Sequence, residues 1–166
     1  SAGVPSVMDD DGTEVRILCG VFRGQRGPVD IVAADPRYLD VRVPGGKTKR
    51  LKVELERNAF AYVFEGSGHF RDASGPQGVL TERNVGGEEV VTREIAANRS
   101  LVLFDSGDEV VVTAGPEGIR FLLLSGRPIR EPVAWYGPIV MNTRAELETA
   151  VRELNEGSFI KHAAGR

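Results

Sequence analysis

Glycine and proline interrupt this sequence at short, fairly even intervals along most of its length. The 166 residues include 20 glycines and nine prolines, and 21 valines occupy much of the space between them. Short β-favouring runs bounded by turn residues are typical of an all-β sandwich or barrel and differ from the strand–helix alternation of α/β proteins. The sequence therefore predicts an all-β fold.

The predicted strands share β-branched and aromatic residues between turn residues. They cover residues 14–19, 29–33, 38–43, 49–54, 60–64, 79–82, 90–95, 101–104, 110–113 and 119–124. Residues 44–46, 106–108 and 115–118 have the glycine and proline content of turns. We interpret the last two as hairpin turns that join three consecutive strands into a meander.

The end of the chain predicts a single amphipathic helix. Thr143 and Glu146 have the spacing of a capping box, in which the side chain of each residue accepts a hydrogen bond from the backbone of the other. The apolar stripe that follows consists of Leu147, Ala150, Val151 and Leu154. Asn155 and Gly157 then favour termination. So short a helix needs a sheet to pack on, because it is marginal alone in water.

Three segments follow from these patterns. Residues 1–13 contain the acidic stretch 9–11 and are expected to be flexible. Residues 14–138 form the predicted β-barrel, and residues 139–166 form the helix and tail, which we expect to pack on the barrel.

Composition excludes several kinds of site and partner. The net charge of −3 argues against direct electrostatic binding to nucleic acid or to anionic membranes. No apolar run reaches 18 residues, so we expect no membrane span, and we expect a cytoplasmic protein. The single cysteine excludes an internal disulfide and a cysteine-rich zinc site.

The residue types that carry catalysis or bind metal are sparse. An iron site with two histidines and a carboxylate needs both imidazoles on one cavity, but His69 lies among the predicted strands and His162 lies beyond the helix. Cys19 alternates with apolar residues at the end of a strand, so we expect a buried, inert thiol. We therefore predict no catalytic, cofactor-binding or metal-binding residue in this chain.

One basic cluster and one aromatic stripe stand out. The cluster comprises Lys47, Lys49, Arg50 and Lys52, which we interpret as the solvated side chains of an edge strand. The stripe comprises Phe60, Tyr62 and Phe64, which alternate along one strand and can line a cavity or fill the barrel core.

Three stretches resemble the pirin family of the cupin superfamily. Residues 125–133 (SGRPIREPV) and 136–143 (YGPIVMNT) are similar to the closing segment of pirin-like proteins, which leads into the same kind of helix. Residues 15–20 (VRILCG), followed by Gly24 and by residues 27–29 (GPV), resemble the opening of the second half of these proteins. Residues 61–66 (AYVFEG) are similar to a stretch found throughout cupins.

The resemblance implies a cupin-like β-barrel, or jelly-roll sandwich, with a C-terminal helix. Pirins have two tandem barrels, and this chain is similar only to the second, so it is either part of a longer protein or a second barrel encoded alone. The family's metal, iron or another transition metal, belongs to the first barrel. In this chain Ala59 stands where the ligand glutamate of a cupin is expected, and the two histidine positions fall near Lys52 and Glu54.

Three functions are compatible with these observations. The first is a metal-free structural and protein-interaction module, whose partner is the N-terminal barrel of the same protein, a second copy or another protein. Trp135 and Tyr136 are candidates for that contact. The second is half of a metal-dependent enzyme, because the family includes quercetin 2,3-dioxygenases that act through the first barrel. The third is a metal-free barrel that binds a small molecule.

Overall fold

The computed structural model describes residues 3–29, 33–78 and 94–161. Contacts between Cα atoms divide the chain into two compact units, Ser1–Pro128 and Ile129–Arg166. Within the described ranges, no helix is long and apolar enough to cross a lipid bilayer.

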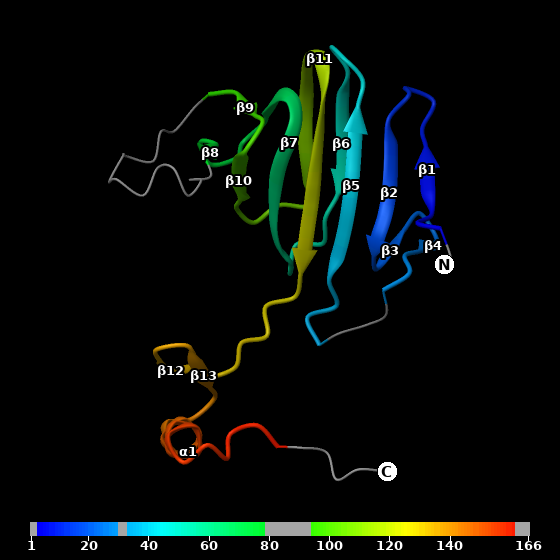
Figure 1. Ribbon diagram of the computed structural model, residues 1–166. Coiled ribbons are helices and arrows are strands. Elements are labelled where there is room, and N and C mark those ends of the chain that lie inside the picture. The colour runs from blue at the N-terminus through cyan, green and yellow to red at the C-terminus, as the bar shows by residue number, and fades with distance from the viewer. Residues whose placement is uncertain (1–2, 30–32, 79–93, 162–166) are drawn as a thin grey trace. The chain divides into compact units, whose positions relative to one another are not determined.

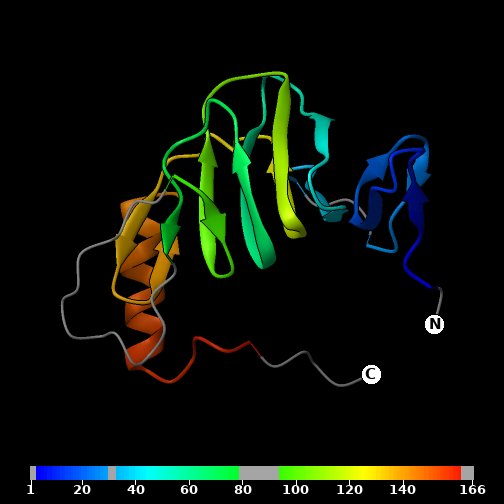
Figure 2. The same ribbon diagram turned by 90° about the horizontal axis from the view of Figure 1, so that it is seen from above.

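In the described part of the first unit, strands are the only regular secondary structure (Figures 1 and 2). They are β1 (Ser6–Met8), β2 (Glu14–Cys19), β3 (Val21–Phe22), β4 (Gln25–Arg26), β5 (Arg37–Val43), β6 (Thr48–Lys52), β7 (Asn58–Phe70), β8 (Gln77–Gly78), β9 (Ala96–Ala97), β10 (Ser100–Phe104) and β11 (Glu109–Gly126). The main path of hydrogen-bonded neighbours is β1-β2-β5-β11-β7-β10-β8, with β6 paired to β11 and β9 paired to β7. The prediction of an all-β fold is confirmed.

Two long strands, β7 and β11, run side by side and carry most of the pairing (Figure 1). Residues 119–125 of β11 pair with β5, whereas residues 109–113 pair with β6. Between these two parts, residues 115–118 interrupt the register with β7. The strand therefore changes partners along its length within one sheet, and strands that bend in this way make the corners of a β-sandwich.

Glycines permit the close contacts at this corner. Gly66 has a φ of +70°, and a Cβ atom there would lie 2.2 Å from the carbonyl oxygen of Gly118. A Cβ atom on Gly45 would lie 1.9 Å from the carbonyl oxygen of Pro116. Both distances are far below van der Waals contact, so only glycine fits at these two positions.

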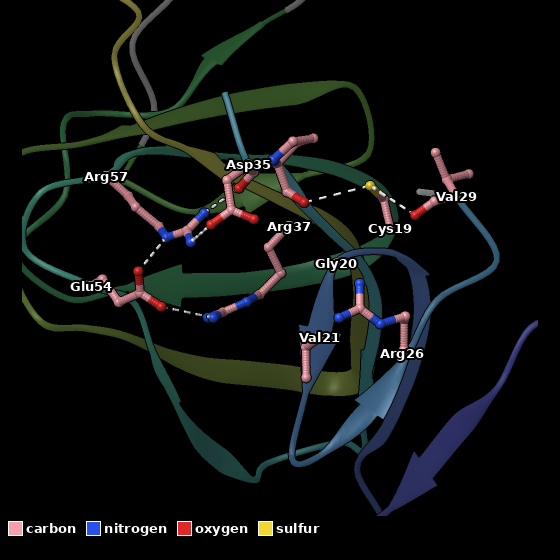
Figure 3. A pocket seen from close by; sticks show the side chains of 10 residues that line it. Cys19, Gly20, Val21, Arg26, Val29, Asp35, Arg37, Glu54 and Arg57 are labelled. Atoms are coloured by element: carbon pink, nitrogen blue, oxygen red, sulfur yellow. Dashed lines mark hydrogen bonds and ion pairs between the residues drawn. The ribbon is translucent and has the colours of Figure 1, made fainter. Parts of the chain in front are cut away.

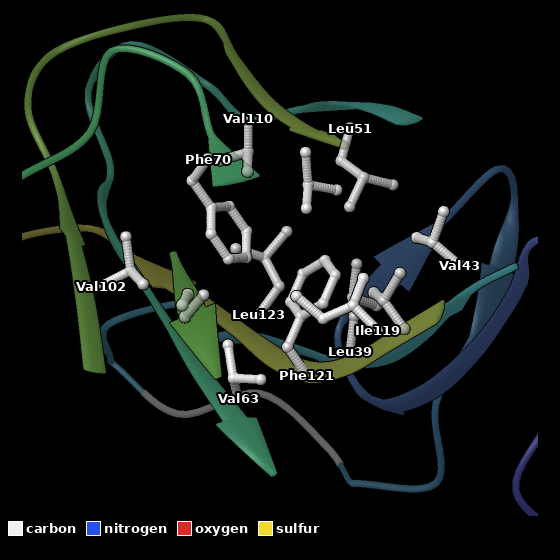
Figure 4. Close-up of a cluster of buried hydrophobic side chains, with 14 of the residues drawn as sticks. Leu39, Val43, Leu51, Val63, Phe70, Val102, Val110, Ile119, Phe121 and Leu123 are labelled. Atoms are coloured by element: carbon white, nitrogen blue, oxygen red, sulfur yellow. The ribbon is translucent and has the colours of Figure 1, made fainter. Parts of the chain in front are cut away.

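Apolar side chains fill the space enclosed by the first unit (Figure 4). Phe121, Leu39 and Val63 are almost completely buried there. The ring of Phe70 lies edge-on to Phe121, with centroids 5.2 Å apart, and its centroid is 5.6 Å from that of Phe104. Such tilted aromatic contacts are favourable, and they leave the core of this unit densely packed.

The second unit is a hairpin with one helix, and it contains β12 (Ala134–Tyr136), β13 (Ile139–Met141) and α1 (Arg144–Asn155). Both hydrogen bonds of the predicted capping box between Thr143 and Glu146 are present. Leu147 and Ala150 are buried against Ile139 of the hairpin. The predicted helix and the inner part of its apolar stripe are therefore confirmed.

The predicted meander is wrong. Residues 110–113 and 119–124 belong to the single strand β11, and residues 115–118 form an irregularity within it, not a hairpin turn. Strand β10 pairs with β7 and β8, and β11 pairs with β5, β6 and β7. The glycine and proline residues at 115–118 correctly marked an interruption of regular pairing, but partners distant in the sequence decided which strands became neighbours. The predicted strand at 79–82 and most of that at 90–95 lie outside the described residues.

The boundaries of the predicted segments also differ. The segment 1–13, expected to be flexible, contains β1, which pairs with β2 in antiparallel register. The division between the units falls after Pro128, ten residues before the predicted boundary. The packing of the helix on the barrel stays a prediction.

Candidate functional site

The barrel interior is the first place to test for a metal centre, because cupins hold their metal there. Lys52 and Glu54, near the two expected histidine positions, are exposed, and Ala59 packs against the apolar core. His69 is exposed on β7, and His162 lies outside the described residues. Among the described residues, no three His, Cys, Asp or Glu side chains gather as metal ligands would. The residues that the structure describes in this interior therefore do not fit the metal of a cupin.

The aromatic stripe on β7 does not line the interior. Ala61 and Val63 are fully buried, so the alternate positions Phe60, Tyr62 and Phe64 lie on the opposite face of the strand. The interpretation that these rings line a cavity or fill the core is wrong. Both alternate sets are apolar, and the pattern alone did not show which set faces inward.

The basic cluster on β6 also differs from its prediction. Lys49 is buried, and its ammonium group lies between the carboxylates of Asp9 and Asp11, with Nζ 2.9 Å from Oδ2 of Asp11. The hydrogen bond from Lys49 is the main reason that the pKa of Asp11 falls from 3.8 to about 2. Burial alone would lower the pKa of Lys49, but its hydrogen bonds to the two carboxylates raise it. Lys49 therefore ties the N-terminal segment to β6, and only the other members of the cluster are solvated.

Cys19 is buried, as predicted, at the end of β2. Its Sγ lies 3.5 Å from the carbonyl oxygen of Pro36 and 3.7 Å from that of Val29, and the thiol donates weakly to both. No second nucleophile or base contacts this thiol within the described part of the chain, so the arrangement gives it a structural role.

A small cavity opens beside Cys19, where β2 ends and β5 begins (Figure 3). Its volume is about 210 Å³. The charged side chains on its lining are Arg26, Arg37, Arg57, Asp35 and Glu54. This cavity therefore combines a concave surface with a cluster of charged groups that come from several elements.

Arg57 organises that cluster. Its guanidinium group contacts Oδ2 and the carbonyl oxygen of Asp35, and its Nε lies 2.6 Å from Oε2 of Glu54. The side chain of Arg57 is only 5% exposed. These hydrogen bonds lower the pKa of both carboxyl groups. Burial opposes the charge of Arg57, but the same bonds outweigh it and raise the pKa of the guanidinium group.

Arg37 joins the cluster from the first residue of β5. Its guanidinium group donates to Oε1 of Glu54 over 3.1 Å and to the carbonyl oxygen of Lys52 over 3.4 Å. Arg26 borders the same cavity from β4, where it pairs with Val21. The sequence alone did not reveal this cluster, because its charged members come from three separate stretches of the chain. The only available signal was the run of charged residues around Glu54.

Comparison with known proteins identifies relatives over nearly the whole chain. The family described as the Pirin C-terminal cupin domain matches residues 38–160. A pirin-like protein of Caulobacter vibrioides is 33% identical over 94% of this chain and 49% of its own length. A Pseudomonas aeruginosa protein named "Putative quercetin 2,3-dioxygenase" is 33% identical over 93% of this chain and 49% of its own length.

A solved structure gives the same result for the fold. The crystal structure of a quercetin 2,3-dioxygenase from Acinetobacter baumannii aligns with a TM-score of 0.69 and 24% identity, over 94% of this chain and 47% of that one. This chain spans about half the length of the curated relatives it matches. The expected cupin-like class is confirmed.

Proposed function

The chain belongs to the pirin family, in which it matches the C-terminal cupin domain, and we propose that it serves as a metal-free structural and protein-interaction module. The observation that carries the proposal is the filled interior of the barrel. The interior of the first unit is packed with apolar side chains, such as Phe121, Leu123 and Val63, and these side chains offer no ligand atoms to a metal. A transition metal bound there would need a converging set of nitrogen or oxygen ligands.

The second unit supports the interaction role. Eight of the fifteen large apolar side chains that are exposed among the described residues lie in its short stretch, 129–161. Trp135 and Tyr136 are 73% and 68% exposed. Exposed apolar surface of this density is typical of a surface that another protein covers. As its partner we propose the N-terminal barrel of the same protein or, in its absence, a second copy of this chain.

Elemental analysis of the purified chain tests the metal-free state. We expect far less than one iron, zinc or manganese per chain after purification in the presence of each metal. A stoichiometric transition metal that resists dialysis would contradict the proposal.

Sedimentation and binding measurements test the interaction role. We expect weak self-association of the chain, and binding to a separately produced N-terminal barrel of a full-length pirin. The double substitution Trp135→Ser and Tyr136→Ser should weaken both. Leu55→Ser removes a side chain of similar exposure, 67%, from the first unit and should change neither. A monomer at high concentration that does not bind the barrel would refute the interaction role.

The names of two relatives favour a second candidate, half of a metal-dependent quercetin dioxygenase. In that case the metal and the chemistry would belong to the first barrel, and this chain would support it. Oxygen consumption with quercetin separates the candidates: the chain alone should show none, and a metal-loaded protein with both barrels should show it only if the second candidate holds. Turnover by the chain alone that survives a chelator would contradict both.

A further inference from the structure

The charged cavity beside Cys19 takes no part in the proposed metal-free core or in the exposed apolar surface of the second unit. It is bordered by the ends of β2 and β4 and by the start of β5 (Figure 3). Three guanidinium groups and two carboxylates lie on its lining. The cavity therefore has an excess of one positive charge.

The ion pairs within the cluster leave the excess positive charge near Arg26. Arg57 engages both carboxylates, and Arg37 shares Glu54 with it. Arg26 forms no ion pair or side-chain hydrogen bond within the described ranges. The positive charge available to a ligand is consequently that of Arg26, together with the N–H groups of Arg37 that do not donate to Glu54 or to the carbonyl oxygen of Lys52.

The cavity is held in shape by contacts that do not involve a ligand. Arg57 is nearly buried and fixes Asp35 and Glu54 by hydrogen bonds. A Cβ atom on Gly20 would lie 2.8 Å from the carbonyl oxygen of Pro36, so the backbone segments on this side are in close contact. A site whose walls are fixed in advance loses little conformational freedom on binding.

We propose that this cavity binds a small dianion whose oxygens accept hydrogen bonds, such as inorganic phosphate or a short dicarboxylate, between Arg26 and Arg37. Guanidinium groups form paired hydrogen bonds with the oxygens of carboxylates and phosphates. A cavity of about 210 Å³ holds an anion of this size. It is smaller than the roughly 300–1,000 Å³ typical of sites for drug-sized ligands. A flavonoid is therefore not the ligand of this site.

Calorimetric titration of the whole chain tests this site. Inorganic phosphate and succinate are the probes, and chloride keeps the ionic strength constant, because screening alone changes the affinity of charged groups. We expect saturable binding of one anion per chain by at least one probe. A preference between the probes shows whether the site favours a tetrahedral phosphate or a dicarboxylate. If neither probe binds, the proposal is refuted.

Two matched variants locate the site. Arg26→Gln should weaken binding at least tenfold. Arg71→Gln removes an equal charge from an exposed arginine that does not line this cavity, and it should leave the affinity unchanged. Because Arg26 is exposed, its substitution leaves the fold intact, which a thermal melt verifies. Equal loss of affinity in both variants would show nonspecific attraction and overturn the assignment.

Discussion

Replacement of Lys49 by methionine tests the buried ion cluster that joins β6 to the N-terminal segment. The substitution keeps the length of the apolar stem but removes the ammonium group from between Asp9 and Asp11. The side chain of Asp9 is 7% exposed, so its carboxylate cannot recover the lost contact from water. Removal of one member of a buried ion pair typically costs about 3–5 kcal/mol.

Two features of the structure place the expected loss near the lower end of that range. Arg23 still contacts the other oxygen of Asp9, and the side chain of Asp11 is 33% exposed and retains some hydration. We therefore expect Lys49→Met to lower the free energy of unfolding by about 3 kcal/mol at pH 7. Lys52→Met is the matched control, because Lys52 lies exposed on the same strand and should change stability by less than about 0.5 kcal/mol.

The pH dependence of the loss gives a second, independent measurement. The pKa of Asp11 falls from 3.8 to about 2 in the folded protein, chiefly through the hydrogen bond from Lys49. The stabilisation that this provides is complete above pH 3.8 and is lost as the pH falls toward 2, because the unfolded chain then binds the proton first. The difference between the wild type and Lys49→Met should therefore shrink across this interval.

Urea denaturation at pH 7 and at several values down to pH 2 measures both effects. A loss at pH 7 no larger than that of Lys52→Met would refute the argument that the buried ammonium group stabilises the fold. A difference that stays constant between pH 4 and pH 2 would refute the assigned coupling between Lys49 and Asp11.

Four further substitutions test the two units separately. Thr143→Ala should lower the stability of the second unit by about 1 kcal/mol through loss of the helix cap. Leu147→Ala should lower it by about 2–4 kcal/mol through loss of a buried side chain. Urea melts measure both losses, and melts of both variants that coincide with the wild type would mean that the helix does not pack. A residue with a side chain pays about 1–2 kcal/mol to adopt a left-handed backbone conformation. Gly66→Ala should destabilise the first unit by more than this, because its Cβ atom would also lie 2.2 Å from a carbonyl oxygen. Gly137 also has a positive φ but has open space around it, so Gly137→Ala should cost only the energy of the left-handed conformation. Equal losses of stability at the two glycines would contradict the steric argument.

Features that depend on neighbouring residues could be predicted from the sequence. The capping box of Thr143 and Glu146 and the burial of Leu147 involve groups within one or two turns of a helix, so their spacing was sufficient. The strand β2 was predicted with its observed bounds, because Val15, Ile17 and Cys19 alternate along it and place apolar side chains on one face. The resemblance of the closing segment to pirins also located the family correctly.

Features that depend on distant partners were decided only by the tertiary structure. On β7 both faces are apolar, and pairing with β10 and β11 determined that Val63 faces inward and Tyr62 outward. Lys49 resembled its solvated neighbours, yet its partner Asp11 is 38 residues away along the chain. The cavity beside Cys19 likewise exists only because the ends of β2 and β4 lie near the start of β5. Local periodicity states which side chains share a face, but burial and charge pairing depend on what the rest of the fold brings against that face.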